Sequence, residues 1–115
     1  MVASRDVGRV AAGLMQERGT GLRIVELEGP RRTSPNDLAD AFARAIGKPV
    51  RAAPVPRESW DTLFRSQGMK NPEPRMRMLD GFNQGWIDFE SGGCNAIKGP
   101  TDAVTVIAGL VAEAR

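Results

Sequence analysis

The pattern that most constrains the fold is a strand, a helix and a second strand that follow one another in the first half of the chain. Residues 22–27 have Ile24-Val25 as a β-branched centre, and Gly29-Pro30 ends this first strand. A helix begins at Ser34-Pro35-Asn36-Asp37, because this run combines a capping hydroxyl, a proline at the first helical position and an acid in the first turn. Residues 50–55 form the second strand, and Pro54 and Pro56 place it at a sheet edge.

The helix between these strands has one apolar face and ends at Gly47. Its apolar face consists of Leu38, Ala41, Phe42, Ala45 and Ile46. A strand-helix-strand unit of this kind gives two parallel strands with a right-handed crossover. We therefore predict an α/β fold with a small parallel β-α-β core and additional helices. If the apolar face is buried, Phe42→Ala should cost about 3–5 kcal/mol.

The additional helices lie on both sides of this unit. Ser4 is placed to cap the first helix, residues 57–67 form a short one, and Thr101 is placed to cap the last. The first and last helices have apolar residues three and four positions apart: Val7, Val10, Ala11 and Leu14 in the first, and Val104, Ile107, Ala108 and Val111 in the last.

Length and composition indicate one folded domain over residues 1–115, with 41% hydrophobic and 26% charged residues. The 16 Lys and Arg residues nearly balance the 14 Asp and Glu residues, and the basic residues are scattered. Nucleic-acid binding is not favoured, because it needs a continuous basic stripe. The sequence has neither the apolar core of a signal peptide nor a run of membrane-spanning length. We therefore expect a cytoplasmic protein that does not bind membranes.

The residue types that are missing exclude several kinds of catalytic site. Without tyrosine or histidine, the chain can build neither a Tyr-x-x-x-Lys relay nor a Ser-His-Asp triad. With Cys94 as its single cysteine, it has no intramolecular disulfide and no transition-metal site. No glycine-rich turn joins a strand to a helix, so the isolated chain should not bind a dinucleotide. We predict no catalytic, cofactor-binding or metal-binding residue.

Two groups of potentially reactive side chains are better explained without a catalytic role. Lys98 is the one cation near Cys94 in sequence, and a nucleophilic cysteine needs a base or a cation beside it, so an incidental loop thiol is the favoured interpretation. Asp80, Asp88 and Glu90 fall in one stretch, where a pair of carboxylates could share acid-base work. Charges that decorate a solvated helix face are the commoner case, and we favour it here.

Residues 78–88 are unusual for a plain core helix, because two glycines alternate with aromatic and amide side chains. Phe82 and Trp86 have the spacing of core residues, and core packing is the favoured interpretation for each. A polar amide beside an apolar stripe needs a partner, which makes Asn83 the better candidate for a ligand contact. We therefore predict Phe82, Asn83 and Trp86 as the residues of a substrate cleft.

Several stretches together resemble the latter half of NmrA-like proteins, which are atypical relatives of the short-chain dehydrogenases. The first three are Val25-Glu26-Leu27-Glu28-Gly29-Pro30, Ser34-Pro35-Asn36-Asp37-Leu38-Ala39 and Gly47-Lys48-Pro49-Val50. Residues 78–90, beginning Met78-Leu79-Asp80-Gly81-Phe82-Asn83, resemble the bacterial branch described as azoreductase-like or as NmrA-family regulators. The resemblance covers essentially the whole chain.

This resemblance implies that the chain is a substrate-side lobe without its dinucleotide-binding half, whether as a fragment, a split gene or the product of a misassigned start. In such proteins the other half carries the glycine-rich turn and binds NAD(P), while Phe82, Asn83 and Trp86 lie near the substrate cleft. We expect a non-catalytic lobe that acts with a separate dinucleotide-binding polypeptide or remains as a ligand-sensing or regulatory domain. The alternatives are a homodimerising interaction module, and part of an NAD(P)H-dependent oxidoreductase that is active when complemented. A small-molecule ligand is compatible with each.

Overall fold

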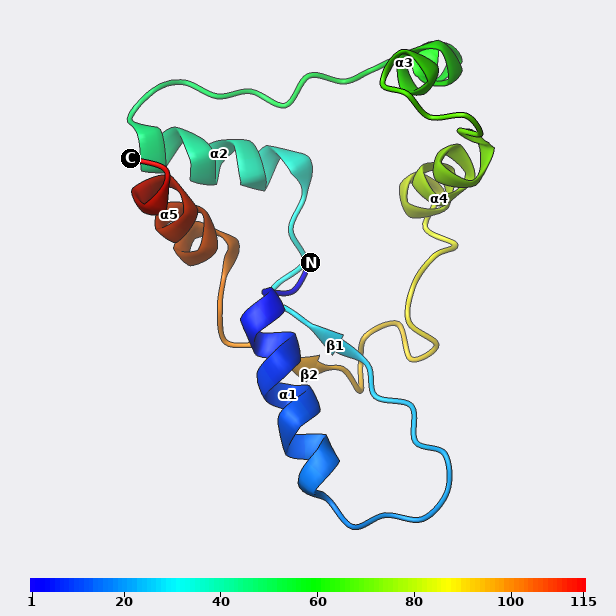
Figure 1. Ribbon diagram of the computed structural model, residues 1–115, viewed down its shortest axis with the longest axis vertical. Helices are drawn as coiled ribbons and strands as arrows, with labels where there is room; N and C mark the ends of the chain where they lie inside the picture. The colour runs from blue at the N-terminus through cyan, green and yellow to red at the C-terminus, as the bar shows by residue number, and fades with distance from the viewer. The chain divides into compact units, whose positions relative to one another are not determined.

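The computed structural model describes residues 1–115 and divides them into two compact units. The first unit contains residues 1–52 and 93–115, and the second contains residues 53–92. In the first unit lie α1 (Ser4–Gln16), β1 (Leu27–Glu28), α2 (Pro35–Ile46), β2 (Ile97–Lys98) and α5 (Ala103–Glu113) (Figure 1). In the second lie the 3-10 helix η1 (Arg57–Ser59), α3 (Trp60–Ser66) and α4 (Glu73–Gln84). The chain is α/β, as predicted.

The sheet has two parallel strands, β1 and β2, with Leu27 opposite Ile97 and Glu28 opposite Lys98. The backbone N–H of Ile97 donates to the carbonyl of Glu26 at 2.8 Å, and the N–H of Gly99 donates to that of Glu28 at 2.7 Å. The prediction of a small parallel sheet is therefore confirmed. Its second strand comes from a segment near the C-terminus that the sequence pattern did not single out.

Both predicted strands are wrong in extent. Residues 50–55 contain no strand, because Pro49, Pro54 and Pro56 remove three N–H donors from an eight-residue stretch. Of residues 22–27, only Leu27 belongs to a strand. Leu22 and Ile24 are 94% and 74% exposed, so their apolar side chains bury no face of a sheet.

The predicted start and end of α2 are confirmed. The Ser34 hydroxyl accepts the backbone N–H of Asp37 at 3.2 Å, and the Asp37 carboxylate accepts the Ser34 N–H at 2.7 Å, which completes a capping box. These hydrogen bonds from Ser34 lower the pKa of Asp37 below its usual value. Gly47 follows the helix with φ of 68°, the left-handed conformation that glycine adopts without strain.

Two predicted caps are wrong. The residue before α1 is Ala3, which makes no side-chain cap, and Ser4 is already helical. At the start of α5 the cap is Asp102, whose carboxylate accepts the N–H of Thr105 at 2.8 Å. Thr101 does not cap because its hydroxyl donates instead to the carboxylate of Asp6.

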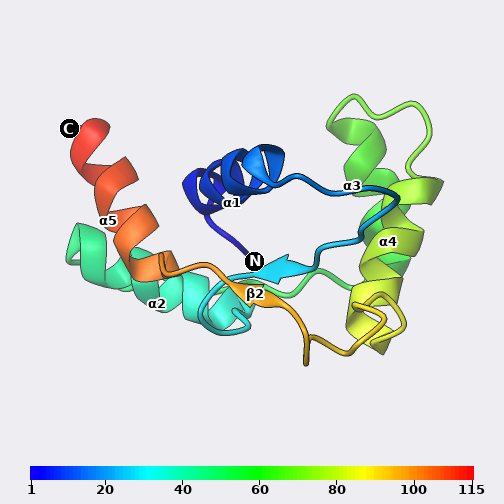
Figure 2. The same cartoon turned by 90° about the horizontal axis from the view of Figure 1, so that it is seen from below.

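The core of the first unit lies between α2 and α5, which are side by side in both views (Figures 1 and 2). Its buried apolar side chains are Ala39, Ala41 and Ile107. The predicted apolar face of α2 is only partly right, because Phe42 is 41% exposed and Ile46 also lies at the surface. The small alanine side chains occupy the contact between the two helices and allow them to pack closely, while the larger Phe42 and Ile46 lie outside this contact.

This exposure lowers the expected effect of Phe42→Ala. A fully buried phenylalanine costs about 3–5 kcal/mol when truncated, whereas the half-exposed ring of Phe42 should cost about 1–2 kcal/mol. Urea unfolding followed by far-ultraviolet circular dichroism measures the difference. A loss above about 3 kcal/mol, the value for a fully buried ring, would contradict the observed exposure and restore the original prediction.

The second unit holds its helices together with arginines. Arg57 donates to both carboxylate oxygens of Asp80, at 2.9 Å from Nε and 2.8 Å from Nη2, and its guanidinium carbon lies 4.9 Å from the centre of the Trp60 ring. Arg75 lies over the buried Phe64 ring at the same distance. These contacts join α4 to η1 and α3, and the short helix predicted over residues 57–67 is confirmed.

The Arg57–Asp80 pair predicts a pH dependence for the second unit. The hydrogen bonds from Arg57 hold the pKa of Asp80 below its ordinary value of 3.8. A carboxyl with a lowered folded pKa stabilises the fold above its unfolded pKa, and this stabilisation is lost as the pH falls through the folded pKa. Asp80→Asn should therefore reduce the urea midpoint at pH 7 and make the midpoint fall less between pH 5 and pH 2.5.

The measurement is tryptophan fluorescence, because Trp60 and Trp86 both lie in the second unit. The control is Glu58→Gln, which removes an exposed carboxylate from the same unit. An acid dependence that is the same in Asp80→Asn and in the unmodified chain would show that the ion pair does not stabilise this unit.

Candidate functional site

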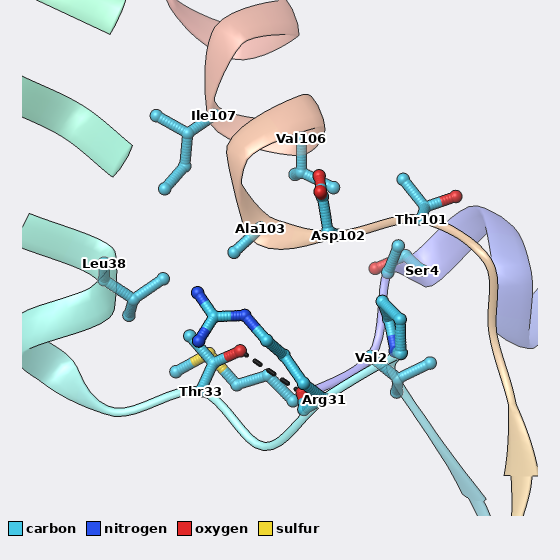
Figure 3. A pocket seen from close by; sticks show the side chains of 13 residues that line it. Val2, Ser4, Arg31, Thr33, Leu38, Thr101, Asp102, Ala103, Val106 and Ile107 are labelled. Atoms are coloured by element: carbon cyan, nitrogen blue, oxygen red, sulfur yellow. Dashed lines mark hydrogen bonds between the residues drawn. The ribbon is translucent and has the colours of Figure 1, made fainter. Parts of the chain in front are cut away.

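A cavity of about 170 Å³ lies in the first unit, at the carboxyl ends of both parallel strands (Figure 3). Four segments line it: residues 1–4 before and at the start of α1, residues 30–33 after β1, Leu38 of α2, and residues 101–107 after β2. In parallel α/β sheets, ligands bind beyond the carboxyl ends of the strands. The cavity therefore occupies the position at which this type of sheet presents a ligand site.

Gly29 shapes the entrance to this cavity by admitting the N-terminal segment beside β1. Its N–H donates to the carbonyl of Met1 at 2.9 Å, and a Cβ atom at Gly29 would lie 2.6 Å from that oxygen. Any larger residue would push the segment away. The Gly29-Pro30 step, which the sequence pattern identified as a strand end, thus also brings residues 1–4 into the cavity wall.

The wall is mainly apolar and comes from α2 and α5. Figure 3 shows the Arg31 side chain extending into the space between Leu38 and Ala103. Val106 and the buried Ile107 form the rest of the apolar wall. Because the same contacts hold α2 against α5, the cavity is built into the core of the unit.

Most polar groups around the cavity already have partners. Arg31 forms an ion pair with Asp37 at 3.2 Å between Nη1 and Oδ1. Asp102 is held by Thr105, and these hydrogen bonds, together with the weaker attraction of Arg31, lower the pKa of Asp102. The Thr33 hydroxyl donates to the carbonyl of Arg31 at 3.4 Å. These pairings fix the charges in place before any ligand enters.

Asp6 positions the loop that forms one side of the cavity. Its side chain is 1% exposed, and its carboxylate accepts the N–H and the hydroxyl of Thr101, both at 2.9 Å. Gly99 fits beside it because a Cβ there would lie 2.8 Å from the Asp6 Oδ2. Charge-assisted hydrogen bonds of this kind are strong, so Asp6 ties α1 to the start of α5. Apart from its place in a first helical turn, Asp6 has no feature in the sequence that distinguishes it.

The predicted cleft residues Phe82, Asn83 and Trp86 lie in the second unit, and none of them lines the cavity. Phe82 and Trp86 are 59% and 57% exposed, so the expectation that they form core is wrong. Trp86 lies outside α4, which ends at Gln84. As a site for a substrate these three residues remain a prediction.

The two glycines of this stretch serve the chain reversal after α4. The N–H groups of Trp86 and Ile87 donate to the carbonyl of Gly81 at 3.0 and 3.2 Å. A Cβ at Gly81 would lie 2.5 Å from the Ile87 Cδ1, and Gly85 has φ of 78°. The close approach expected from these glycines is present, and it is made by the protein's own side chains.

The other candidate groups do not come together as a reactive centre. Asp80 is paired with Arg57, while Asp88 accepts the N–H of Phe89 at 2.8 Å. Cys94 is exposed, and Lys98 forms an ion pair with Glu28. Glu28 is a buried carboxylate that sequence reasoning missed, because only the strand register shows that it faces Lys98. The structure contains no group of three side chains suited to hold a metal ion.

Among the residues that line the cavity, Leu38 and Ile107 were predicted on apolar helix faces and Ser4 and Thr101 as helix caps, and none was predicted to contact a ligand. No helix in the structure combines the length and the apolar character needed to cross a membrane. Comparison of the chain with protein-family models, with curated proteins and with solved structures found no match.

Proposed function

We propose that this chain is a non-catalytic ligand-binding lobe of the NmrA-like type, acting with a separate dinucleotide-binding polypeptide or as a ligand-sensing domain. The observation that carries the proposal is the cavity at the carboxyl ends of β1 and β2. Its mainly apolar wall with a few polar groups is the usual composition of a small-molecule site. The separate dinucleotide-binding partner is suggested by the motifs that resemble the NmrA-like family.

The pairing of polar groups supports binding over chemistry. A general base or nucleophile needs a reacting group within hydrogen-bond reach and a second residue that orients it. Here Asp102 is held by Thr105, Arg31 by Asp37, and the hydroxyl of Thr101 by Asp6. The two charged side chains of the lining are committed to structural contacts, which favours recognition of a ligand by shape over its activation.

Xenon provides a test that needs no knowledge of the ligand, because it enters apolar protein cavities. Under xenon pressure, the methyl resonances of Leu38, Val106 and Ile107 should shift, while those of Val111 on the same helix, which does not line the cavity, should stay. Ala103→Leu fills part of the space and should reduce the shifts. If the lining methyls behave like those of Val111, the proposed site does not exist.

The proposal also predicts how the isolated chain behaves toward nucleotides. Because no glycine-rich turn precedes a helix in this sequence, calorimetric titration should give no micromolar affinity for NADPH. Micromolar binding by the purified chain would contradict the need for a separate dinucleotide-binding partner.

A homodimerising interaction module is a second candidate function, favoured by the amount of surface that the chain exposes. The chain exposes 8963 Å², whereas a compact protein of 12.4 kDa exposes about 6,100 Å². If the two units are counted as separate compact bodies, the expected exposed area rises only to about 7,300 Å². The remaining excess is larger than the roughly 800 Å² that each partner buries in a standard interface.

The face of α1 formed by Val7, Val10 and Leu14 suits a second copy, because a twofold axis lets one apolar face cover itself. Ile107 is buried against α2 and is therefore not part of this surface. Light scattering at micromolar concentration should give about twice the 12.4 kDa chain mass. Leu14→Asp should give monomers, and Ala12→Asp on the opposite face should not. A monomer in all three proteins would remove this candidate.

A further inference from the structure

We infer that the cavity selects uncharged, mostly apolar molecules of about the size of one six-membered ring that carry a single hydroxyl or carbonyl group. This inference rests on the proposed function, because it concerns the ligand of the same cavity. It follows from the volume of the cavity, from the balance of charges in its lining, and from the polar groups left without partners there.

The volume suits a ligand with a single ring. A protein cavity of about 150 Å³ lined by aliphatic and aromatic side chains holds benzene. The cavity here measures about 170 Å³, so a ring with one or two additional heavy atoms fills it. Leu38, Val106 and Ile107 provide the apolar contacts for such a ring.

The charges favour a neutral ligand. The side chains of the lining include one cation, Arg31, and one carboxylate, Asp102, which attract each other. A ligand anion would compete with Asp37 for the Arg31 guanidinium and would also face Asp102, whereas a ligand cation would meet Arg31. Either charge would lose part of its hydration without gaining an unused partner, which is unfavourable.

One set of polar groups remains for the ligand. The hydroxyls of Thr33 and Thr101 already donate to the carbonyl of Arg31 and to Asp6. The Ser4 hydroxyl lines the cavity, and the first N–H groups of α1 and α5 have no acceptor within their own helices. A hydroxyl or carbonyl oxygen on the ring can accept hydrogen bonds there, which gives the ligand its orientation.

Four probes that share one ring separate these requirements: benzyl alcohol, toluene, benzoate and benzylammonium. Titrations followed by the methyl resonances of Leu38, Val106 and Ile107 give their affinities for the full chain. We expect benzyl alcohol to bind about tenfold more tightly than either charged probe, a difference of about 1.4 kcal/mol, because a charged probe loses part of its hydration without gaining a partner. Ser4→Ala should weaken benzyl alcohol by about threefold to tenfold, within the range for one hydrogen bond, and should leave toluene unchanged.

Two outcomes overturn the inference in different ways. If benzoate or benzylammonium binds as tightly as benzyl alcohol, the selection for neutral ligands is wrong while the cavity remains a binding site. If none of the four probes shifts the cavity methyls, and xenon also fails, the proposed function is wrong together with the inference. Because Ser4 has no side-chain role in capping α1, its alanine variant should keep the fold, which circular dichroism would verify.

Discussion

The Ile107→Ala variant is expected to lose about 2–4 kcal/mol of unfolding free energy, the range for truncating a buried aliphatic side chain in a core. Ile107 is 5% exposed and is the largest buried apolar side chain between α2 and α5. The first unit has few other buried apolar groups, and small proteins are stable by only about 5–15 kcal/mol. The loss is therefore large enough to unfold a substantial part of the population at 37 °C.

Hydrogen exchange of the α2 and α5 amides measures this loss within the first unit, where tryptophan fluorescence is silent. Val104→Ala, on the same helix and more exposed, is the matched control and should lose less than about 1 kcal/mol. Equal effects of the two substitutions would mean that α5 does not pack on α2 through Ile107.

The Asp6→Ala variant is expected to release α1, with a loss of about 2–3 kcal/mol for the two charge-assisted hydrogen bonds to Thr101. No other element makes extensive contact with α1, which is otherwise attached through the bond between the N–H of Gly29 and the carbonyl of Met1. The amides of α1 should then exchange with solvent at nearly the rate of a free peptide. The α2 and α5 amides should change far less, because their mutual packing does not depend on Asp6.

Arg5→Ala provides the control, since Arg5 is an exposed residue of the same first turn. The protection of the α1 amides in Asp6→Asn should lie between the values for Asp6→Ala and Arg5→Ala, because an amide keeps the size of the side chain and one acceptor oxygen but loses the charge. Protection of α1 that is the same in Asp6→Ala and Arg5→Ala would show that another contact anchors this helix.

Local chemistry predicted the parts of this fold that depend on neighbouring residues. The capping box of Ser34 and Asp37, the terminal Gly47 and the short helix after Pro56 are all set within a few positions, and the structure confirms them. The predicted caps at Ser4 and Thr101 failed for a reason that lies far away in sequence. Thr101 donates to Asp6, and no local pattern reveals a competitor 95 positions away.

The strands and the cavity could not be predicted for a related reason. The pairing of Glu28 with Lys98 joins segments whose own strand signal is only two residues long, while the longer apolar run before Leu27 has no sheet to join. The cavity takes its residues from four segments, and each contributes ordinary side chains. Phe82 and Trp86 stood out because they are aromatic and near glycines, although those glycines serve a chain reversal.

The division of the first unit into two separate stretches of sequence has a consequence for the order in which the chain can fold during synthesis. Residues 53–92 form a compact unit from one continuous segment, so the Arg57–Asp80 pair can close once that segment has left the ribosome. Helix α2 can pack only later, because β2, which pairs with β1, and α5, which packs on α2, are synthesised last. Until then its apolar residues face solvent or a chaperone, and the nascent chain is most vulnerable to aggregation in the interval before α5 emerges.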